Sequence, residues 1–69
     1  MRKYTVIYEH GPRNWSAYVP DLPGCVATGK TRRETAKRMR EAIEFHLEGM
    51  RLHNEPIPEP NVVAGVVCV

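Results

Sequence analysis

Two segments near the start of the chain carry the pattern of a β-hairpin. Residues 4–9 are rich in β-branched and aromatic side chains, and residues 15–20 add a clear alternation of apolar and polar positions. In the second segment Trp15, Ala17 and Val19 fall on one face, while Ser16 and Tyr18 fall on the other. Residues 10–14 between them contain the glycine and proline of a turn. The pattern therefore predicts two antiparallel strands joined by a short loop.

A second turn follows at residues 20–24. Pro23 and Gly24 suit the two central positions of a type II turn, because proline fixes φ and glycine accepts a positive φ. Residues 25–28 then form a short third strand, which completes an antiparallel meander.

The middle of the chain is predicted to be a helix that begins at a capping box, Thr31-x-x-Glu34. Apolar residues then recur at helical spacing through about residue 52: Ala36, Met39, Ile43, His46, Leu47 and Met50. A helix of that length, about 30 Å, covers one face of a sheet. Residues 54–60 contain three prolines and form an extended connector instead.

The last segment, residues 61–69, is apolar at both alternating sets of positions. This pattern is typical of a strand buried on both sides. The expected fold is therefore α+β with the order β-β-β-α-β, a right-handed helical crossover, and a single domain spanning residues 1–69.

Composition narrows the functional classes. A domain of 69 residues has a small core, and Cys25 and Cys68 are too few for a disulfide scaffold, so self-association is the expected source of extra stability. The net charge of +2 does not by itself indicate nucleic-acid binding. Without an apolar run of about 20 residues or a leader-like start, we expect a cytoplasmic protein that does not bind membranes.

An enzyme is not supported by any spacing of reactive residues. No serine or cysteine has a histidine and a carboxylate at a catalytic spacing, and there is no phosphate-binding glycine loop. Cys25 follows a turn and is interpreted as a small buried side chain rather than a reactive thiol. Glu41, Glu44 and Glu48 share one helix side, where a solvated face is favoured over a cation site. No cofactor or metal is expected.

The helix charges run against the macrodipole. Basic residues occupy the first half: Lys30, Arg32, Arg33, Lys37, Arg38 and Arg40. Acidic residues would be favoured there. This arrangement suggests an acidic partner, either a protein or a nucleic acid, although a solvated basic surface without a role explains it too.

Trp15 and Tyr18 point to opposite faces of one strand, and a single helix covers only one face. One of these aromatics is therefore expected on the uncovered face, where aromatic side chains commonly anchor interfaces.

Several motifs together resemble the HicB-like antitoxin family. One motif is a strand that ends in Pro20-Asp21-Leu22-Pro23-Gly24-Cys25 and is followed by Thr28-Gly29-Lys30-Thr31. The family's E-A-like pair at the helix start is represented here by Glu34-Thr35-Ala36, which is a small departure. Residues 41–49 and the proline-rich residues 56–60 match the family as well, so the resemblance covers nearly the whole chain.

This resemblance implies a prokaryotic toxin–antitoxin system. It implies a partial RNase H-like fold with strand order 3-2-1-4, no nuclease site, and direct binding of a HicA-like toxin, a small ribonuclease that cleaves mRNA using a histidine. Many family members carry a further DNA-binding segment. Because this chain stops at Val69, we expect no operator binding by the chain itself.

The expected contacts combine the resemblance with the residue patterns. The expected toxin-binding residues are Trp15, Tyr18, Asp21, Leu22, Arg33, Lys37 and Arg40. As an edge strand without charges, residues 61–69 are expected to form a dimer or tetramer interface through Val63, Val67 and Val69.

Two other functions remain open. The first is a small oligomeric nucleic-acid-binding protein that uses the basic first half of the helix. The second, ranked last, is a metal-dependent nuclease that retains RNase H chemistry. That nuclease would need clustered carboxylates on the sheet, where only Glu9 and Asp21 lie near strand ends.

Overall fold

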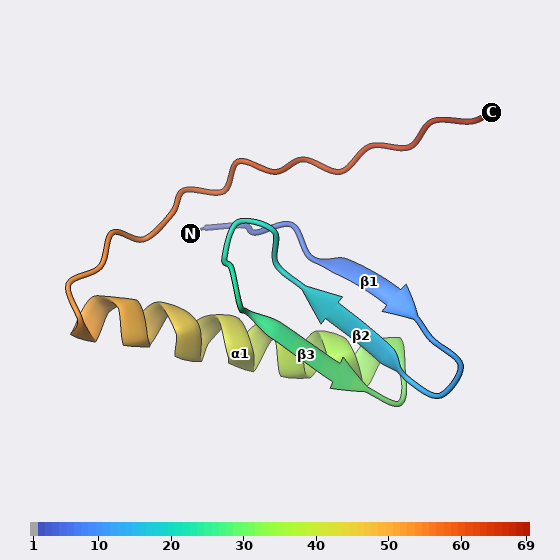
Figure 1. Cartoon of the computed structure of the whole chain (residues 1–69), viewed down its shortest axis with the longest axis horizontal. Helices are drawn as coiled ribbons and strands as arrows, with labels where there is room; N and C mark the ends of the chain where they lie inside the picture. The colour runs from blue at the N-terminus through green and yellow to red at the C-terminus, as the bar shows by residue number, and fades with distance from the viewer. Residues whose placement is uncertain (1) are drawn as a thin grey trace.

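A computed structural model describes residues 2–69 and contains one antiparallel sheet and one helix. The strands are β1 (Ile7–His10), β2 (Trp15–Tyr18) and β3 (Val26–Gly29), in the sheet order β1-β2-β3. The helix α1 (Arg32–Leu52) follows them (Figure 1). The α+β class, the three-stranded meander and the position of the helix are confirmed.

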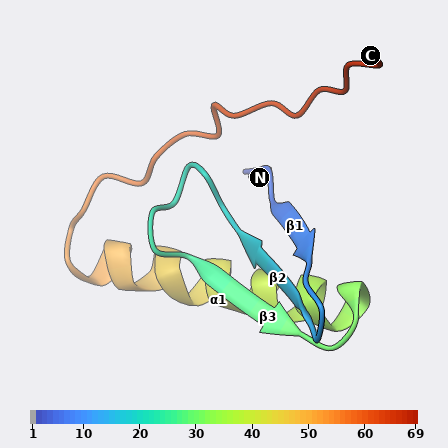
Figure 2. The ribbon, with the colours of Figure 1, turned by 45° about the vertical axis from the view of Figure 1, so that its right-hand side comes forward.

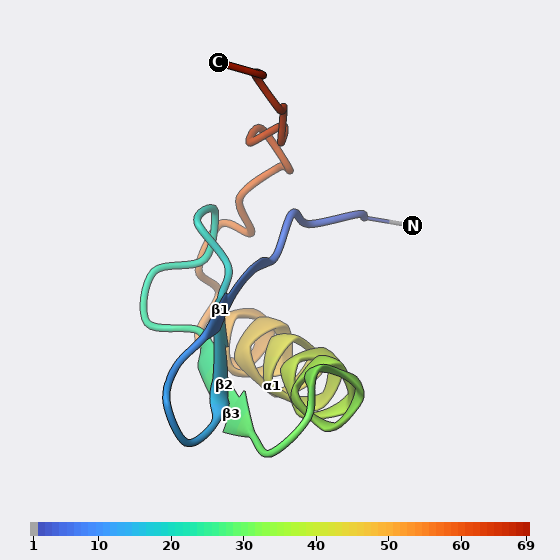
Figure 3. The same cartoon turned by 90° about the vertical axis from the view of Figure 1, so that its right-hand side faces the viewer.

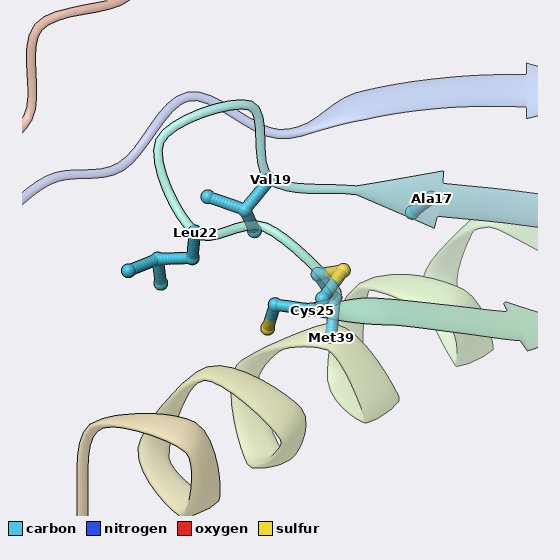
Figure 4. Close-up of a cluster of buried hydrophobic side chains, with 5 residues drawn as sticks. All are labelled: Ala17, Val19, Leu22, Cys25 and Met39. Carbon is cyan, nitrogen blue, oxygen red and sulfur yellow. The ribbon is translucent and has the colours of Figure 1, made fainter. Parts of the chain in front are cut away.

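The core lies between the sheet and α1, which covers a single face of the sheet (Figure 3). The helix packs mainly on β3 and β2, so β1 is the strand least covered by it. Within residues 2–69 the five buried apolar residues come from β2, the turn that follows it, and the helix (Figure 4): Ala17, Val19, Leu22, Cys25 and Met39. This core is small because only one helix contributes to it.

The turn between β2 and β3 has the predicted geometry. Cys25 N–H donates to the Leu22 carbonyl oxygen at 3.1 Å, and Gly24 has φ of 83°. These are the features of a type II turn with Pro23 and Gly24 at its centre. A preceding turn, in which Leu22 N–H donates to the Val19 carbonyl oxygen at 3.0 Å, directs the chain inward.

Both ends of α1 are capped, the first by side chains and the second by a residue with a positive φ. Thr31 Oγ1 accepts from the Glu34 N–H at 3.0 Å, as the capping box predicts, and Glu34 Oε1 accepts from the Lys30 N–H at 3.3 Å. At the other end Asn54 takes a left-handed φ of 55°, which stops the helix before the prolines. A helix suited to crossing a bilayer, which needs about 20 apolar residues, is absent from residues 2–69.

The predicted fourth strand is wrong for the single chain. Residues 61–69 form no strand and are exposed, and they run clear of the sheet in both views of Figures 1 and 2. The strand order 3-2-1-4 and the partial RNase H-like fold are therefore not supported by the described residues. The physical reason is that a strand apolar on both faces needs cover on both faces, and one helix supplies cover on one only.

Gly29 is a position at which the sheet and helix approach closely. A Cβ there would lie 2.7 Å from Thr35 Oγ1 and 3.0 Å from Thr35 N. Thr35 is buried and its hydroxyl donates to the Thr31 carbonyl oxygen at 2.8 Å, so it has little freedom to move. We expect Gly29→Ala to lower the free energy of unfolding by about 1–3 kcal/mol.

Urea denaturation measures this change. The matched control is Gly49→Ala in α1, where an added Cβ meets nothing within 4 Å. That variant should gain about 0.5–1 kcal/mol, because alanine favours the helix over glycine. Equal stability of the Gly29→Ala variant and the unaltered chain would show that the sheet and helix are not packed this closely.

Cys25 provides a second test of the core. Burial raises the pKa of its thiol, because an apolar surrounding disfavours the thiolate. We therefore expect iodoacetamide to modify Cys25 far more slowly in the folded chain than in denaturant, with labelling that rises only at a higher pH than for a free thiol. Mass spectrometry of the Cys25 peptide gives both rates, and equal rates would place this residue outside the core.

Candidate functional site

The face of the sheet opposite α1, here named the open face, carries a row of apolar side chains. Ile7 pairs with Tyr18, and Tyr18 pairs with Val26, so the three lie side by side across β1, β2 and β3. Tyr18 is 41% exposed and Val26 is 63% exposed, whereas neighbouring Ala17 is buried against the helix. Side chains alternate along a strand, which places this row on the uncovered side.

The same face becomes polar toward the β1–β2 hairpin. Glu9 pairs with Ser16, and Ser16 pairs with Thr28, which gives a polar row beside the apolar one. A patch with an apolar centre and a polar border is the usual composition of a protein-binding surface. The open face therefore has the chemistry to bind another protein.

Trp15 lies on the opposite side from Tyr18. It shares a face with the buried Ala17, and its ring stacks on the ring of His10, with centroids 4.4 Å apart and an interplanar angle of 10°. Of the two aromatics weighed from the sequence, Tyr18 is therefore the one on the open face. Trp15 instead lies at the end of the sheet that is near the start of α1.

The turn after β2 does not present Leu22 to a partner, contrary to the expectation from its sequence. Leu22 is 0% exposed and belongs to the core. The reason is the inward turn at residues 19–22, which places an apolar side chain where it contributes burial.

Asp21 has a different role from the one expected of a free surface residue. Its Oδ2 accepts hydrogen bonds from the backbone N–H groups of Asn61 and Val62, both at 3.0 Å. Thr5 Oγ1 donates to the Val62 carbonyl oxygen at 2.6 Å, and Tyr4 Oη donates to the Pro58 carbonyl oxygen at 2.6 Å. Together these contacts tie residues 58–62 to the start of the chain and to the turn between β2 and β3.

Three of the six basic residues at positions 30–40 have partners within the chain: Arg32, Arg38 and Arg40. Arg32 lies over the Tyr8 ring, with its guanidinium carbon 4.7 Å from the ring centroid. Arg38 donates to the Thr28 carbonyl oxygen at 3.1 Å and also pairs with Glu34 at 3.3 Å. These contacts offset the unfavourable interaction of the basic residues with the helix dipole.

The three basic residues that were predicted to contact a toxin differ in whether they form an ion pair within the chain. Arg40 pairs with Glu44 at 3.3 Å, whereas Arg33 and Lys37 are exposed and form no ion pair within residues 2–69. Both belong to α1, which covers the face of the sheet opposite to the open face (Figure 3). The structure therefore does not unite the predicted contact residues into one surface.

The acidic side of α1 is also engaged. Glu44 pairs with Arg40, and Glu48 pairs with Arg51 at 2.9 Å. Within residues 2–69 no three His, Cys, Asp or Glu side chains come together in a way that could hold a metal ion.

The sequence alone did not identify three residues of these surfaces. Ile7 and Val26 flank Tyr18, and only the pairing register of the strands reveals that they do. Phe45 is 83% exposed on the outer side of α1. Its position between Glu44 and His46, off the main apolar stripe, was the available signal.

Comparison with known proteins identifies the family to which the domain is similar over nearly its whole length. Residues 4–68 match the family described as the HicB-like antitoxin of bacterial toxin–antitoxin systems. A UPF0150 protein of Thermoplasma acidophilum is 42% identical over 60 residues, which covers 86% of this chain and 87% of that protein. A second UPF0150 protein, from Synechocystis, is 31% identical over 61 residues, covering 87% of this chain and 77% of that protein.

An uncharacterised 14.9 kDa protein of Haemophilus phage HP1 is 37% identical over 60 residues, and this chain spans 45% of its length. No solved structure matches the chain. The family match includes all of the residues that build the meander and the helix. The chain belongs to the HicB-like antitoxin family.

Proposed function

We propose that the chain is an antitoxin that neutralises a HicA-like, mRNA-cleaving toxin by direct protein–protein contact, acting in the cytoplasm where the toxin meets mRNA. Membership of an antitoxin family supports a toxin partner in general. The observation that carries the contact surface is the open face, with its row of Ile7, Tyr18 and Val26.

The open face suits protein recognition on energetic grounds. Its backbone is held in the sheet, so little conformational entropy is lost when a partner binds. Tyr18 combines a large apolar ring with a hydroxyl group, which is typical of residues that anchor interfaces. Ile7 and Val26 on either side exclude water around it, and the polar row of Glu9, Ser16 and Thr28 supplies hydrogen-bonding groups at the border.

The basic helix has a secondary role in this proposal. Arg33 and Lys37 are exposed and form no ion pair within residues 2–69, so their charges act through solvent. Exposed charges of this kind mainly accelerate association with an acidic partner and are screened by salt.

The decisive variant is Tyr18→Ala. If Tyr18 anchors the interface, its loss should weaken toxin binding by about 2 kcal/mol, or roughly 30-fold in Kd. Titration calorimetry with a HicA-type toxin measures this change, with circular dichroism to show that the variant is folded. The matched control is Phe45→Ala, which removes an even more exposed aromatic from the outer side of α1 and should leave Kd unchanged.

A double charge reversal, Arg33→Glu with Lys37→Glu, distinguishes the two surfaces. We expect it to slow association and change the salt dependence, while the dissociation rate stays nearly constant. Loss of toxin binding in this variant, combined with normal binding by Tyr18→Ala, would move the contact to the helix. Salt-sensitive binding to RNA in place of the toxin would favour the nucleic-acid-binding alternative.

A further inference from the structure

The basic side chains that form no ion pair gather at one end of the molecule. The lysine and arginine residues that pair with an acid are Arg2, Arg38, Arg40 and Arg51. Those that form no ion pair within residues 2–69 are Lys3, Arg13, Lys30, Arg32, Arg33 and Lys37. All of these except Lys3 lie in the β1–β2 hairpin or in residues 30–37, which lead into and begin α1.

The strand register brings these two segments together. His10, Trp15 and Gly29 pair in one row across the three strands. The hairpin that contains Arg13 and the β3–α1 loop that contains Lys30 therefore lie at the same end of the sheet (Figures 1 and 2). The surface formed by these two residues and the first residues of α1 is here named the basic end: Arg13, Lys30, Arg32 and Arg33.

Few acidic residues balance the basic end. Among residues 9–14 and 29–37 only Glu9 and Glu34 are acidic. Glu34 is already engaged, because it pairs with Arg38 and accepts from the Lys30 N–H. An excess of positive charge therefore remains there, and a surface of this kind attracts an anionic ligand.

A stack of two rings stands beside these charges. The ring centroids of His10 and Trp15 are 4.4 Å apart, and the interplanar angle is 10°. Trp15 is half-buried, whereas His10 is exposed. The face of the His10 ring that is turned away from Trp15 is therefore open to a third planar ring. Nucleic-acid bases that are not paired in a duplex stack on aromatic side chains in this way.

Arg32 adds a donor group to the same end. Its guanidinium carbon lies 4.7 Å from the centroid of the Tyr8 ring. Stacking on a ring uses the face of the guanidinium group and leaves its in-plane N–H groups available. Such N–H groups match the oxygens of a phosphate.

We infer that the basic end binds single-stranded RNA, with a base stacked on His10 and the neighbouring phosphates held by Arg13, Lys30 and Arg32. The ring stack favours this ligand over an acidic protein, because carboxylate side chains carry no base to extend the stack. The choice of RNA rests on the proposed function, since the proposed toxin acts on mRNA. This surface is separate from the open face, so RNA is bound in addition to a toxin.

Fluorescence anisotropy with a labelled RNA of about 12 nucleotides tests the charges on the chain alone. Arg13→Ala and Lys30→Ala should each weaken binding and each lower the slope of log Kd against log salt by about 0.7, the value for one phosphate contact to a single strand. The matched control is Lys3→Ala, which removes an exposed lysine without an ion pair from the other end of β1 and should leave the slope unchanged.

The ring stack is tested by His10→Ala, which should weaken RNA binding roughly 10-fold through loss of one stacked base. His10→Phe keeps a ring at this position and should restore most of the affinity. Circular dichroism shows that both variants are folded. A duplex of the same sequence should bind more weakly, because its bases are already stacked on one another.

Two further variants separate this surface from the proposed toxin contact. Tyr18→Ala should leave RNA binding unchanged, and His10→Ala should leave the Kd for a toxin unchanged. Failure of the chain to bind RNA at hundreds of micromolar and low salt would overturn the assignment of the basic end and would leave the toxin contact untouched. Equal effects of Lys3→Ala and Lys30→Ala, full affinity in His10→Ala, tighter binding of single-stranded DNA, or equal competition by polyglutamate would each overturn it too.

Discussion

One helix packs on one face of a three-stranded sheet, and this one-sided cover governs the rest of the molecule. The buried residues of β2 and its following turn face Met39 on α1, and residues 2–69 supply no second layer for the opposite face. Apolar side chains on that face stay in contact with water unless another molecule covers them. The open face and the exposed residues 63–69 are both consequences of this limit, since each carries more apolar surface than the single helix can bury.

The turn between β2 and β3 shows how few residues connect the core to the surface. Leu22 points inward and completes the core, while adjacent Asp21 points outward and holds the backbone of Asn61 and Val62. Gly24 permits the positive φ that returns the chain to β3. A motif that resembles a recognition loop in sequence is therefore mainly structural, because its side chains are already engaged within the chain.

The charge distribution on α1 is also largely accounted for by internal contacts. Arg32 over Tyr8, Arg38 at Thr28 and Glu34, and Arg40 with Glu44 engage three of the basic residues. Exposed ion pairs each contribute little to stability, but they reduce the repulsion that suggested an acidic ligand. The basic helix thus provides weaker support for nucleic-acid binding than its composition alone indicates.

Local sequence patterns correctly predicted the three strands of the meander and the helix. Alternation predicted β1 and β2, the Pro23–Gly24 pair predicted the type II turn, and the Thr31 capping box predicted the start of α1, because each depends on neighbouring residues alone. The resemblance motifs likewise identified the family that the comparisons establish.

Tertiary structure decided the features that depend on distant residues. Strand register aligned Ile7 and Val26 with Tyr18, and the packing of the turn buried Leu22. The fourth strand failed as a prediction because its pattern records only that residues 61–69 need burial. Whether those residues are covered depends on which faces of the sheet the rest of the chain occupies, and periodicity along the chain contains no information about that.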